Sequence, residues 1–243
     1  MLKQDSSVPL YKQLSDIIRQ SIDSGELKSG DKIPTEIELS DMYNISRITV
    51  RKAISDLVQL GVIVKKQGKG TFVKMPKIER KIQYLLSFTE ACKANGLTVT
   101  NKILKKEIIE SDLEDKKSLK LDDDDKLVYI QRLRCTNGDP LMLENNYFSL
   151  KKYKFLLDED LDGSLYDLLA KKYKITPSDP ENSRKDKTSI EIVKASKAEH
   201  ELLNIPIGEP LFYIKTLIVD SLDQPIHIGK QYVIGERYKF VLS

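Results

Sequence analysis

The stretch "NISRITVRKAISDLVQLGVIVKKQGKGTFV", residues 44–73, joins a helical pattern to a short hairpin pattern. Four apolar residues recur at the i, i+3, i+4, i+7 spacing of one helical face: Val50, Ala53, Ile54 and Leu57. Ser46 precedes them as a candidate N-cap, and Gly61 follows them where a left-handed residue commonly ends a helix. We therefore expect a helix over residues 47–60.

After this helix the sequence takes the pattern of a β-hairpin. A β-branched run at 62–64 and a strand-like run at 71–73 flank Gly68-Lys69-Gly70, a turn with a cation at its tip. Upstream, Thr35 and Glu38 have the spacing of a capping box and begin a short amphipathic helix. A tight turn then joins that helix to the basic one, which predicts a helix-turn-helix.

A first helix is predicted from Leu10 to a point near Gly25, because apolar residues recur there at helical spacing. The order helix, helix, helix, hairpin is that of a winged helix-turn-helix. Residues 46–60 would be its recognition helix and residues 68–70 its wing tip.

Basic charge is concentrated in this region. Residues 44–75 hold seven Lys or Arg against one acid, a net charge of +6, whereas the whole chain carries only +3. A basic face at the start of a helix and on a hairpin tip fits the electrostatic footprint of duplex DNA. The alternative is a solvated cationic surface with no partner.

The composition argues against several other classes of protein. With 243 residues, of which 40% are hydrophobic, the chain suits two domains with real cores. No apolar run approaches the roughly 18 residues of a membrane span, and no signal-peptide pattern begins the chain, so we expect a cytoplasmic protein without membrane association. Two cysteines without motif spacing and only two histidines predict neither a metal site nor a cofactor.

The first third of the chain resembles the DNA-binding domain of the GntR family of bacterial transcription regulators. The matching motifs, between residues 8 and 73, are Pro9-Leu10-Tyr11, Gly25, Gly30-Asp31, Pro34-Thr35-Glu36, Ser46-Arg47, Thr49-Val50-Arg51 and Gly68-Lys69-Gly70-Thr71-Phe72-Val73. On this resemblance the residues expected at DNA are Thr35, Glu36, Ser46, Arg47, Thr49, Arg51, Lys52, Gly68, Lys69 and Gly70. Ile37 stands where many members have an arginine that helps to hold DNA, which leaves that contact open.

The rest of the chain has a different pattern, and the polar segment 74–77 marks the expected boundary between domains 1–75 and 78–243. Strands are predicted at 127–135, 140–148, 211–220 and 226–234, with turn residues between the members of each pair. Helices are predicted at 87–95, 164–172 and 196–203. The expected fold class is α+β, with a mostly antiparallel sheet and helices alongside.

Several polar residues on these elements suggest an anion-binding site. Arg132 and Arg134 are two apart on one strand and share a sheet face, with Glu144 on the paired strand. Ser164 begins a helix, whose free N–H groups suit an anion. This set suits a small phosphorylated, polyhydroxyl molecule. An equally open alternative is that the arginines lie on a solvated face or simply pair with Glu144 and other acids.

Residues 78–241 resemble the UTRA effector-binding domain of the HutC-type branch, which has a chorismate-lyase-like fold. The pattern is similar to that of repressors of amino-sugar use, in which the matching positions hold a sugar phosphate and sugar hydroxyls. The residues expected at the effector are Ser87, Phe88, Thr89, Arg132, Arg134, Glu144, Ser164, Tyr166, His227, Lys230 and Tyr232. His227 replaces a carboxylate that is usual in the family's Pro-x-Glu motif.

The resemblance implies a sequence-specific repressor that binds near-palindromic double-stranded operator DNA as a homodimer and is released by a phosphosugar. One alternative is a regulator that senses a non-sugar acid. Another is an enzyme, because the UTRA fold resembles chorismate lyase, although no nucleophile–base pair stands out and no enzyme activity is expected. A regulator with an all-helical second domain is disfavoured by the predicted strands.

Overall fold

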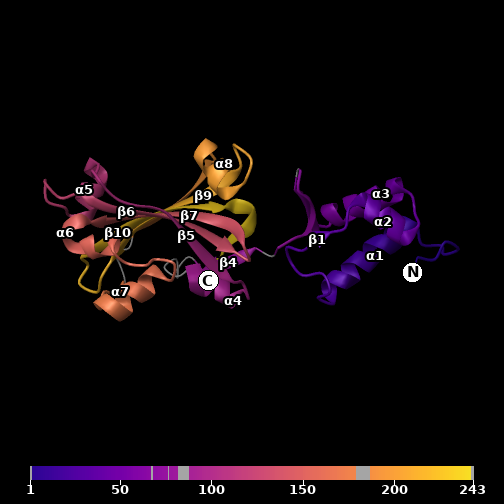
Figure 1. The fold of residues 1–243 in the computed structure, drawn as a ribbon, viewed down its shortest axis with the longest axis horizontal. Coiled ribbons are helices and arrows are strands. Elements are labelled where there is room, and N and C mark those ends of the chain that lie inside the picture. The colour runs from indigo at the N-terminus through magenta and orange to yellow at the C-terminus, as the bar shows by residue number, and fades with distance from the viewer. Residues whose placement is uncertain (1, 67, 76, 82–87, 179–186, 242–243) are drawn as a thin grey trace. The chain divides into compact units, whose positions relative to one another are not determined.

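The computed structural model describes residues 2–66, 68–75, 77–81, 88–178 and 187–241 (Figure 1). The chain forms two compact units, Met1–Pro76 and Lys77–Ser243, and the division between them falls inside the segment 74–77. Among the described residues, no helix has both the length and the apolar character needed to cross a membrane.

The first unit is a three-helix domain with a small antiparallel sheet. Its helices are α1 (Leu10–Asp23), α2 (Glu36–Tyr43) and α3 (Arg47–Gln59), and its strands are β1 (Lys32–Ile33), β2 (Ile63–Lys66) and β3 (Gly70–Val73) in the order β1-β3-β2. The apolar residues of α3 predicted to face inward are all buried, together with Leu14 of α1. This arrangement confirms the predicted winged helix-turn-helix.

Local contacts explain where α2 and α3 begin and end. The capping box forms at α2, where the backbone N–H of Thr35 donates to Glu38 and the backbone N–H of Glu38 donates back to the Thr35 hydroxyl. Asn44 then takes a left-handed backbone with φ of 50°, which ends α2 and turns the chain. The Ser46 hydroxyl accepts from the Thr49 backbone N–H at 3.1 Å and caps α3.

The second unit is built on one six-stranded sheet in which every neighbouring pair is antiparallel. The strand order is β5-β6-β7-β10-β9-β8. The strands are β5 (Val99–Ile109), β6 (Leu127–Thr136), β7 (Asp139–Ser149), β8 (Lys187–Lys194), β9 (Pro210–Val219) and β10 (Pro225–Ile234). The four strands predicted from sequence are the four central ones.

Helices lie on both faces of this sheet (Figure 1). They are α4 (Phe88–Ala94), α5 (Leu113–Leu119), α6 (Leu150–Tyr153), α7 (Leu165–Tyr173) and α8 (Lys197–Leu203). In Figure 1, α4 and α7 lie on one side of the sheet, and α5 and α8 lie on the other. The observed α+β architecture with an antiparallel sheet confirms the predicted fold class.

The two ends of the second unit pair with each other. The short strand β4 (Ile78–Lys81) runs parallel to β11 (Tyr238–Val241), the last described strand of the chain. Lys239 of β11 also forms an ion pair with Glu79 of β4 at 2.7 Å. The chain therefore enters this unit beside its last described strand.

Strand register sets which side chains meet on each face. Arg132 of β6 lies opposite Glu144 of β7, and Glu144 lies opposite Gln231 of β10. His227 of β10 lies opposite Phe148 of β7. Since side chains alternate along a strand, these residues all point to the face that carries α4 and α7.

Candidate functional site

The exposed face of α3 is basic at its N-terminal end. Arg47, Arg51 and Lys52 are all exposed, and the Lys52 ammonium lies 4.1 Å from the centre of the Tyr11 ring. Their charges therefore face solvent at the end of the helix that enters the major groove in helix-turn-helix proteins.

Glu36 connects the recognition helix to the wing. Its carboxylate accepts a hydrogen bond from Arg51 Nε at 3.1 Å and pairs with Lys65 Nζ of β2 at 3.2 Å. Partial burial would raise the pKa of Glu36, but the hydrogen bonds from Arg51 and Lys65 outweigh it and lower the pKa. A carboxylate repels phosphate, so this geometry suits a residue that positions the two cations.

Of the three hydroxyls expected at DNA, those of Thr35 and Ser46 serve as helix caps, and that of Thr49 contacts the Ser46 cap. The Thr35 hydroxyl also donates to Glu38 at 2.9 Å, and the Ser46 and Thr49 hydroxyls lie 2.8 Å apart. All three stand at the N-terminal ends of α2 and α3, where the helix dipoles favour an anion.

The wing tip is exposed and built on glycine. Gly68 and Gly70 have φ of +71° and +120°, values that side chains rarely permit, and Lys69 between them is exposed. The Lys66 ammonium lies 4.9 Å from the centre of the Phe72 ring on the neighbouring strand. The tip thus presents a cation on a narrow loop.

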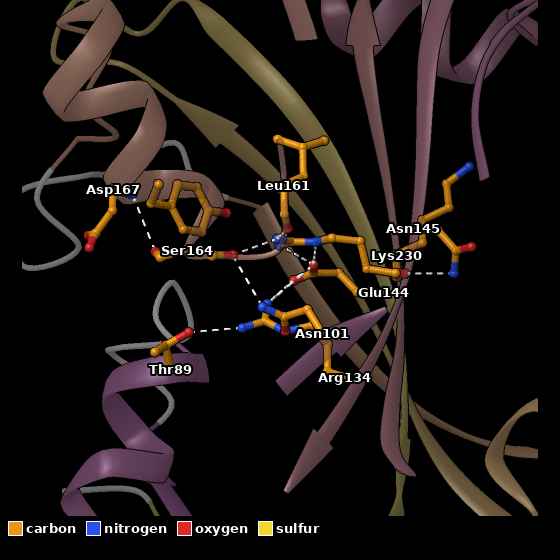
Figure 2. A network of polar contacts seen from close by, with 12 residues as sticks. Thr89, Asn101, Arg134, Glu144, Asn145, Leu161, Ser164, Asp167 and Lys230 are labelled. Atoms are coloured by element: carbon orange, nitrogen blue, oxygen red, sulfur yellow. Dashed lines mark hydrogen bonds and ion pairs between the residues drawn. The ribbon is translucent and has the colours of Figure 1, made fainter. Parts of the chain in front are cut away.

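In the second unit, two arginines enclose one carboxylate beneath α4 and α7 (Figure 2). Arg132 Nε donates to Glu144 at 2.8 Å, its Nη2 donates to the same carboxylate, and Arg134 Nη1 lies 3.2 Å from Glu144 Oε1. All three residues are at most 4% exposed. Burial alone would raise the pKa of Glu144, but the two guanidinium groups overcome that effect and hold its pKa at about 2. The trio is therefore charged and carries a net charge of +1.

Arg132 has a protein acceptor at each of its three guanidinium nitrogens. Besides the two bonds to Glu144, its Nη1 donates to the backbone carbonyls of Leu161 and Gly163 at 3.2 and 3.1 Å. Asn101 of β5 donates to the carbonyls of Asp162 and Gly163 in the same loop. Arg132 thus holds the loop that leads into α7, and it has no nitrogen without a protein acceptor.

Arg134 has a different environment. Its Nη2 donates to the Thr89 hydroxyl at 2.9 Å, and its guanidinium carbon lies 4.7 Å from the centre of the Phe88 ring. Its Nε is buried without a hydrogen-bond partner in the described part of the chain. Of the two arginines, Arg134 is the one with a nitrogen that has no acceptor among the described residues.

His227 is buried on the same face, close to α7. Its ring stacks on Phe148 with centroids 4.6 Å apart, and its Nε2 lies 3.0 Å from the Tyr166 hydroxyl. Burial lowers its pKa to about 4, so the imidazole is neutral near pH 7. Its Nδ1 has no partner among the described residues. Two residues before Tyr166, the Ser164 hydroxyl caps α7 by accepting from the Asp167 backbone N–H at 3.3 Å.

Two expected effector residues lie on the opposite face of the sheet. Lys230 of β10 pairs with Asp115 of α5 at 2.9 Å and stands 4.5 Å from the centre of the Tyr147 ring. Tyr232 packs against Tyr213 on that face. In Figure 2, Lys230 lies across the strands from the helices that carry Thr89 and Ser164. The expectation that Lys230 and Tyr232 join the arginines is therefore wrong, because they alternate with His227. Ser87, also expected there, lies outside the described residues.

Three polar residues share the arginine face but were not predicted from the sequence. They are Asn101 of β5, Asn146 of β7 and Gln231 of β10. Asn146 is buried, and its side-chain amide hydrogen-bonds to Glu144, which helps to lower the pKa of that carboxyl. Strict alternation from Glu144 and His227 would have identified Asn146 and Gln231, whereas Asn101 shares the face because β5 pairs with β6, a pairing that was not predicted.

A cavity of about 230 Å³ lies on the other face, lined by residues that include Glu114, Lys215 and Ile228. Buried charges gather instead on the arginine face, where Arg134 Nε and His227 Nδ1 have no hydrogen-bond partner among the described residues. In the part of the chain that the structure describes, no three His, Cys, Asp or Glu side chains group as metal ligands would.

Comparison with known proteins assigns both units. The family model described as "Bacterial regulatory proteins, gntR family" matches residues 10–73, and the UTRA domain model matches residues 94–239. The Bacillus subtilis protein named "Uncharacterized HTH-type transcriptional regulator YurK" is 34% identical over 100% of this chain and 98% of its own length.

Two further similarities cover nearly all of the chain. An Escherichia coli protein named "Probable fructoselysine utilization operon transcriptional repressor" is 30% identical over 96% of this chain and 94% of its own length. The crystal structure of PhnF from Mycobacterium smegmatis matches 96% of this chain and 97% of its own with a TM-score of 0.66, at 23% identity. The structural match supports the fold.

Proposed function

The chain belongs to the gntR family of bacterial regulatory proteins and carries a UTRA domain, and on that premise we propose that a small phosphorylated sugar releases it from its operator. It is a DNA-binding transcription regulator and not an enzyme, as its family and its relatives are. The winged helix binds DNA, and the UTRA domain binds a small-molecule effector.

The observation that carries the phosphosugar proposal is the unequal use of the two buried arginines. Each nitrogen of Arg132 has a protein acceptor, whereas Arg134 donates to Thr89 through Nη2 and keeps an Nε without a partner among the described residues. The trio with Glu144 has a net charge of +1, which favours an anionic group on the ligand. Guanidinium N–H groups bind phosphate oxygens strongly, and the Thr89 hydroxyl adds a further donor.

The uncharged part of the ligand would meet neutral polar groups. The Nδ1 of His227 and the side-chain amide of Asn146 are neutral polar groups that can hydrogen-bond to hydroxyls. The His227 imidazole is neutral near pH 7. It would therefore not attract a positively charged amine on the ligand as a negatively charged carboxylate would. This set supports a ligand with one anionic end and a hydroxylated remainder.

A non-sugar acid is the second candidate. A carboxylate would also satisfy Arg134, and the net charge of +1 suits a singly charged ligand. The name of the relative linked to fructoselysine use supports a sugar-derived compound for that protein, and we extend it here only as a reason to begin with sugars.

We infer a homodimer on a near-palindromic operator. One winged helix reads only a few base pairs, and helix-turn-helix dimers gain specificity by reading two half-sites about 10 bp apart. Effector binding then needs only to favour a domain arrangement in which the two winged helices of the dimer no longer fit both half-sites. A coupling of about 1–3 kcal/mol is ordinary for such a device.

The test is a thermal-shift screen of the full chain against phosphosugars, matched unphosphorylated sugars and small carboxylic acids. A ligand that binds the folded state raises the melting temperature. We expect phosphosugars to be selected over their unphosphorylated forms, and Arg134→Met to lose the shift. Selection of carboxylic acids alone would refute the sugar, and an undiminished shift in Arg134→Met would refute the site.

A further inference from the structure

Ile48 is an apolar side chain placed where a DNA-reading helix meets bases. It is the second residue of α3 and is 80% exposed, more than any other large apolar side chain described in residues 2–75. Single exposed apolar residues are common on protein surfaces, so exposure alone assigns no role. The direction in which Ile48 projects from α3, however, does indicate a role.

Helical geometry places Ile48 at the centre of the outward face. At about 100° per residue, the buried residues Val50, Ala53, Ile54 and Leu57 centre on one side of α3. Ile48 projects roughly 170° from that centre, whereas Arg47 and Arg51 lie on one flank of it and Lys52 on the other. A helix that buries its apolar side in the domain and docks its basic side on DNA therefore points Ile48 straight at the groove.

The major groove offers one apolar partner. Each base pair displays hydrogen-bond donors and acceptors there, and only thymine adds a methyl group, at C5. The isoleucine has no hydrogen-bonding atom on its side chain, so it cannot read guanine, cytosine or adenine by donation or acceptance. Facing a polar base edge, it would instead cover groups that lose water without replacement.

We propose that Ile48 packs against the C5-methyl group of a thymine in each operator half-site. The inference rests on the DNA-binding role of the winged helix and adds to it a required A·T pair beside the bases contacted by Arg47 and Arg51. The methyl contact gives selectivity that the arginines cannot supply, because guanidinium groups recognise mainly guanine or phosphate.

The experiment removes the methyl group without changing base pairing. The full chain is used to select a binding duplex from a random library, and each thymine of the enriched site is replaced in turn by deoxyuridine. Dissociation constants are measured by fluorescence anisotropy at one salt concentration. We expect one position per half-site at which deoxyuridine weakens binding about fourfold. This factor corresponds to the free energy lost when one methyl group is no longer buried.

Two variants make the result specific to Ile48. In Ile48→Ala the helix is retained, because alanine is the stronger helix former, and the thymine and deoxyuridine duplexes should bind equally. In Val58→Ala, a matched change of a β-branched exposed residue about 15 Å further along α3, the fourfold difference should persist. Circular dichroism of each variant checks that the helix content is unchanged.

Three results would overturn the inference. The first is an enriched site whose affinity for the parent protein does not depend on any thymine methyl. The second is a methyl dependence that persists in Ile48→Ala. If the library yields no enriched site, sequence-specific DNA binding fails as well, and that outcome is distinct from the other two.

Discussion

Replacing Arg132 by methionine should unfold the UTRA domain at a clearly lower temperature than replacing Arg134. Methionine keeps much of the length of the side chain and removes its charge and donors. In the Arg132→Met protein, Glu144 loses the 2.8 Å bond from Nε and the bond from Nη2, and it keeps only the contacts with Arg134 at 3.2 and 3.3 Å. Two carbonyls in the loop before α7 also lose their donor.

The magnitude follows from these contacts. Removing one partner of a buried ion pair costs about 3–5 kcal/mol, and the remaining arginine keeps this case near the lower end. The two abandoned carbonyls add about 1 kcal/mol each, because they lose their donor. A loss of about 5 kcal/mol lowers the melting temperature of a domain this size by roughly 10–20 °C.

The matched variant is Arg134→Met. It leaves the closer pair of Arg132 with Glu144 intact and removes only the longer contacts and the bond to Thr89. We expect a loss of about 1–2 kcal/mol, which corresponds to roughly 2–8 °C. Stability and ligand binding thus divide between the two arginines.

Differential scanning calorimetry of the full chain is the suitable assay, since the protein has no tryptophan to report unfolding. The two units can unfold separately, so the transition that shifts must be assigned, and a DNA duplex that binds the winged helix marks the other one. If both variants melt within about 2 °C of each other, the claim that Arg132 stabilises the domain more than Arg134 does is refuted.

Three further predictions concern pH, salt and the recognition helix. Because burial depresses the pKa of His227 to about 4 from 6.5, the unfolded chain takes up this proton first as pH falls, and stability present above pH 6.5 is lost towards pH 4. The loss should reach about 2 kcal/mol at pH 5 and disappear in His227→Gln, as melting curves across pH would measure; an equal loss in that variant contradicts it. Gel-shift titration should find that Arg47→Ala or Arg51→Ala weakens operator binding by about 1–3 kcal/mol, and no effect from either would mean that α3 is not the reading helix. With about 6–8 phosphates neutralised per dimer, log K against log salt should have a slope of about −5 to −7, whereas a slope near zero would exclude DNA as the partner of the basic face.

The sequence predicted the winged helix in detail because its signals are local. Caps such as Thr35 and Ser46, the left-handed turn at Asn44 and the glycines of the wing each act within a few residues of where they stand. Periodicity then fixed which side of α3 is buried.

The edges of the large sheet were not predicted, for a physical reason. β5 and β8 form the two edges, and each has one strand neighbour instead of two. Edge strands tolerate and often carry charge, as Lys102, Lys105 and Lys106 do in β5, so their apolar alternation is weak. The predicted central strands carry the strong pattern because both neighbours and the helices bury them.

The shared face of the two arginines and Glu144 was predicted from the sequence, and the position of Lys230 and Tyr232 on the opposite face was not. Arg132, Arg134 and Glu144 share a face because their strands pair in the observed register, which sequence spacing within each strand anticipates. Lys230 and Tyr232 were included by resemblance although they alternate with His227. That Glu144 neutralises one arginine charge could not be decided from sequence, since it depends on side-chain geometry across two strands.

The pairing of β4 with β11 has a mechanical consequence. A force applied to the segment 74–77 along the direction of β4 is shared by the backbone hydrogen bonds between β4 and β11, which span four residue pairs. Bonds that share a force in this way resist stretching better than bonds that break one at a time. The first strand after the DNA-binding unit is therefore anchored by the last described strand of the chain. Trimming residues 238–241 would release the entrance of the UTRA domain, and a fusion partner attached after them would stand at that entrance instead of at a remote end.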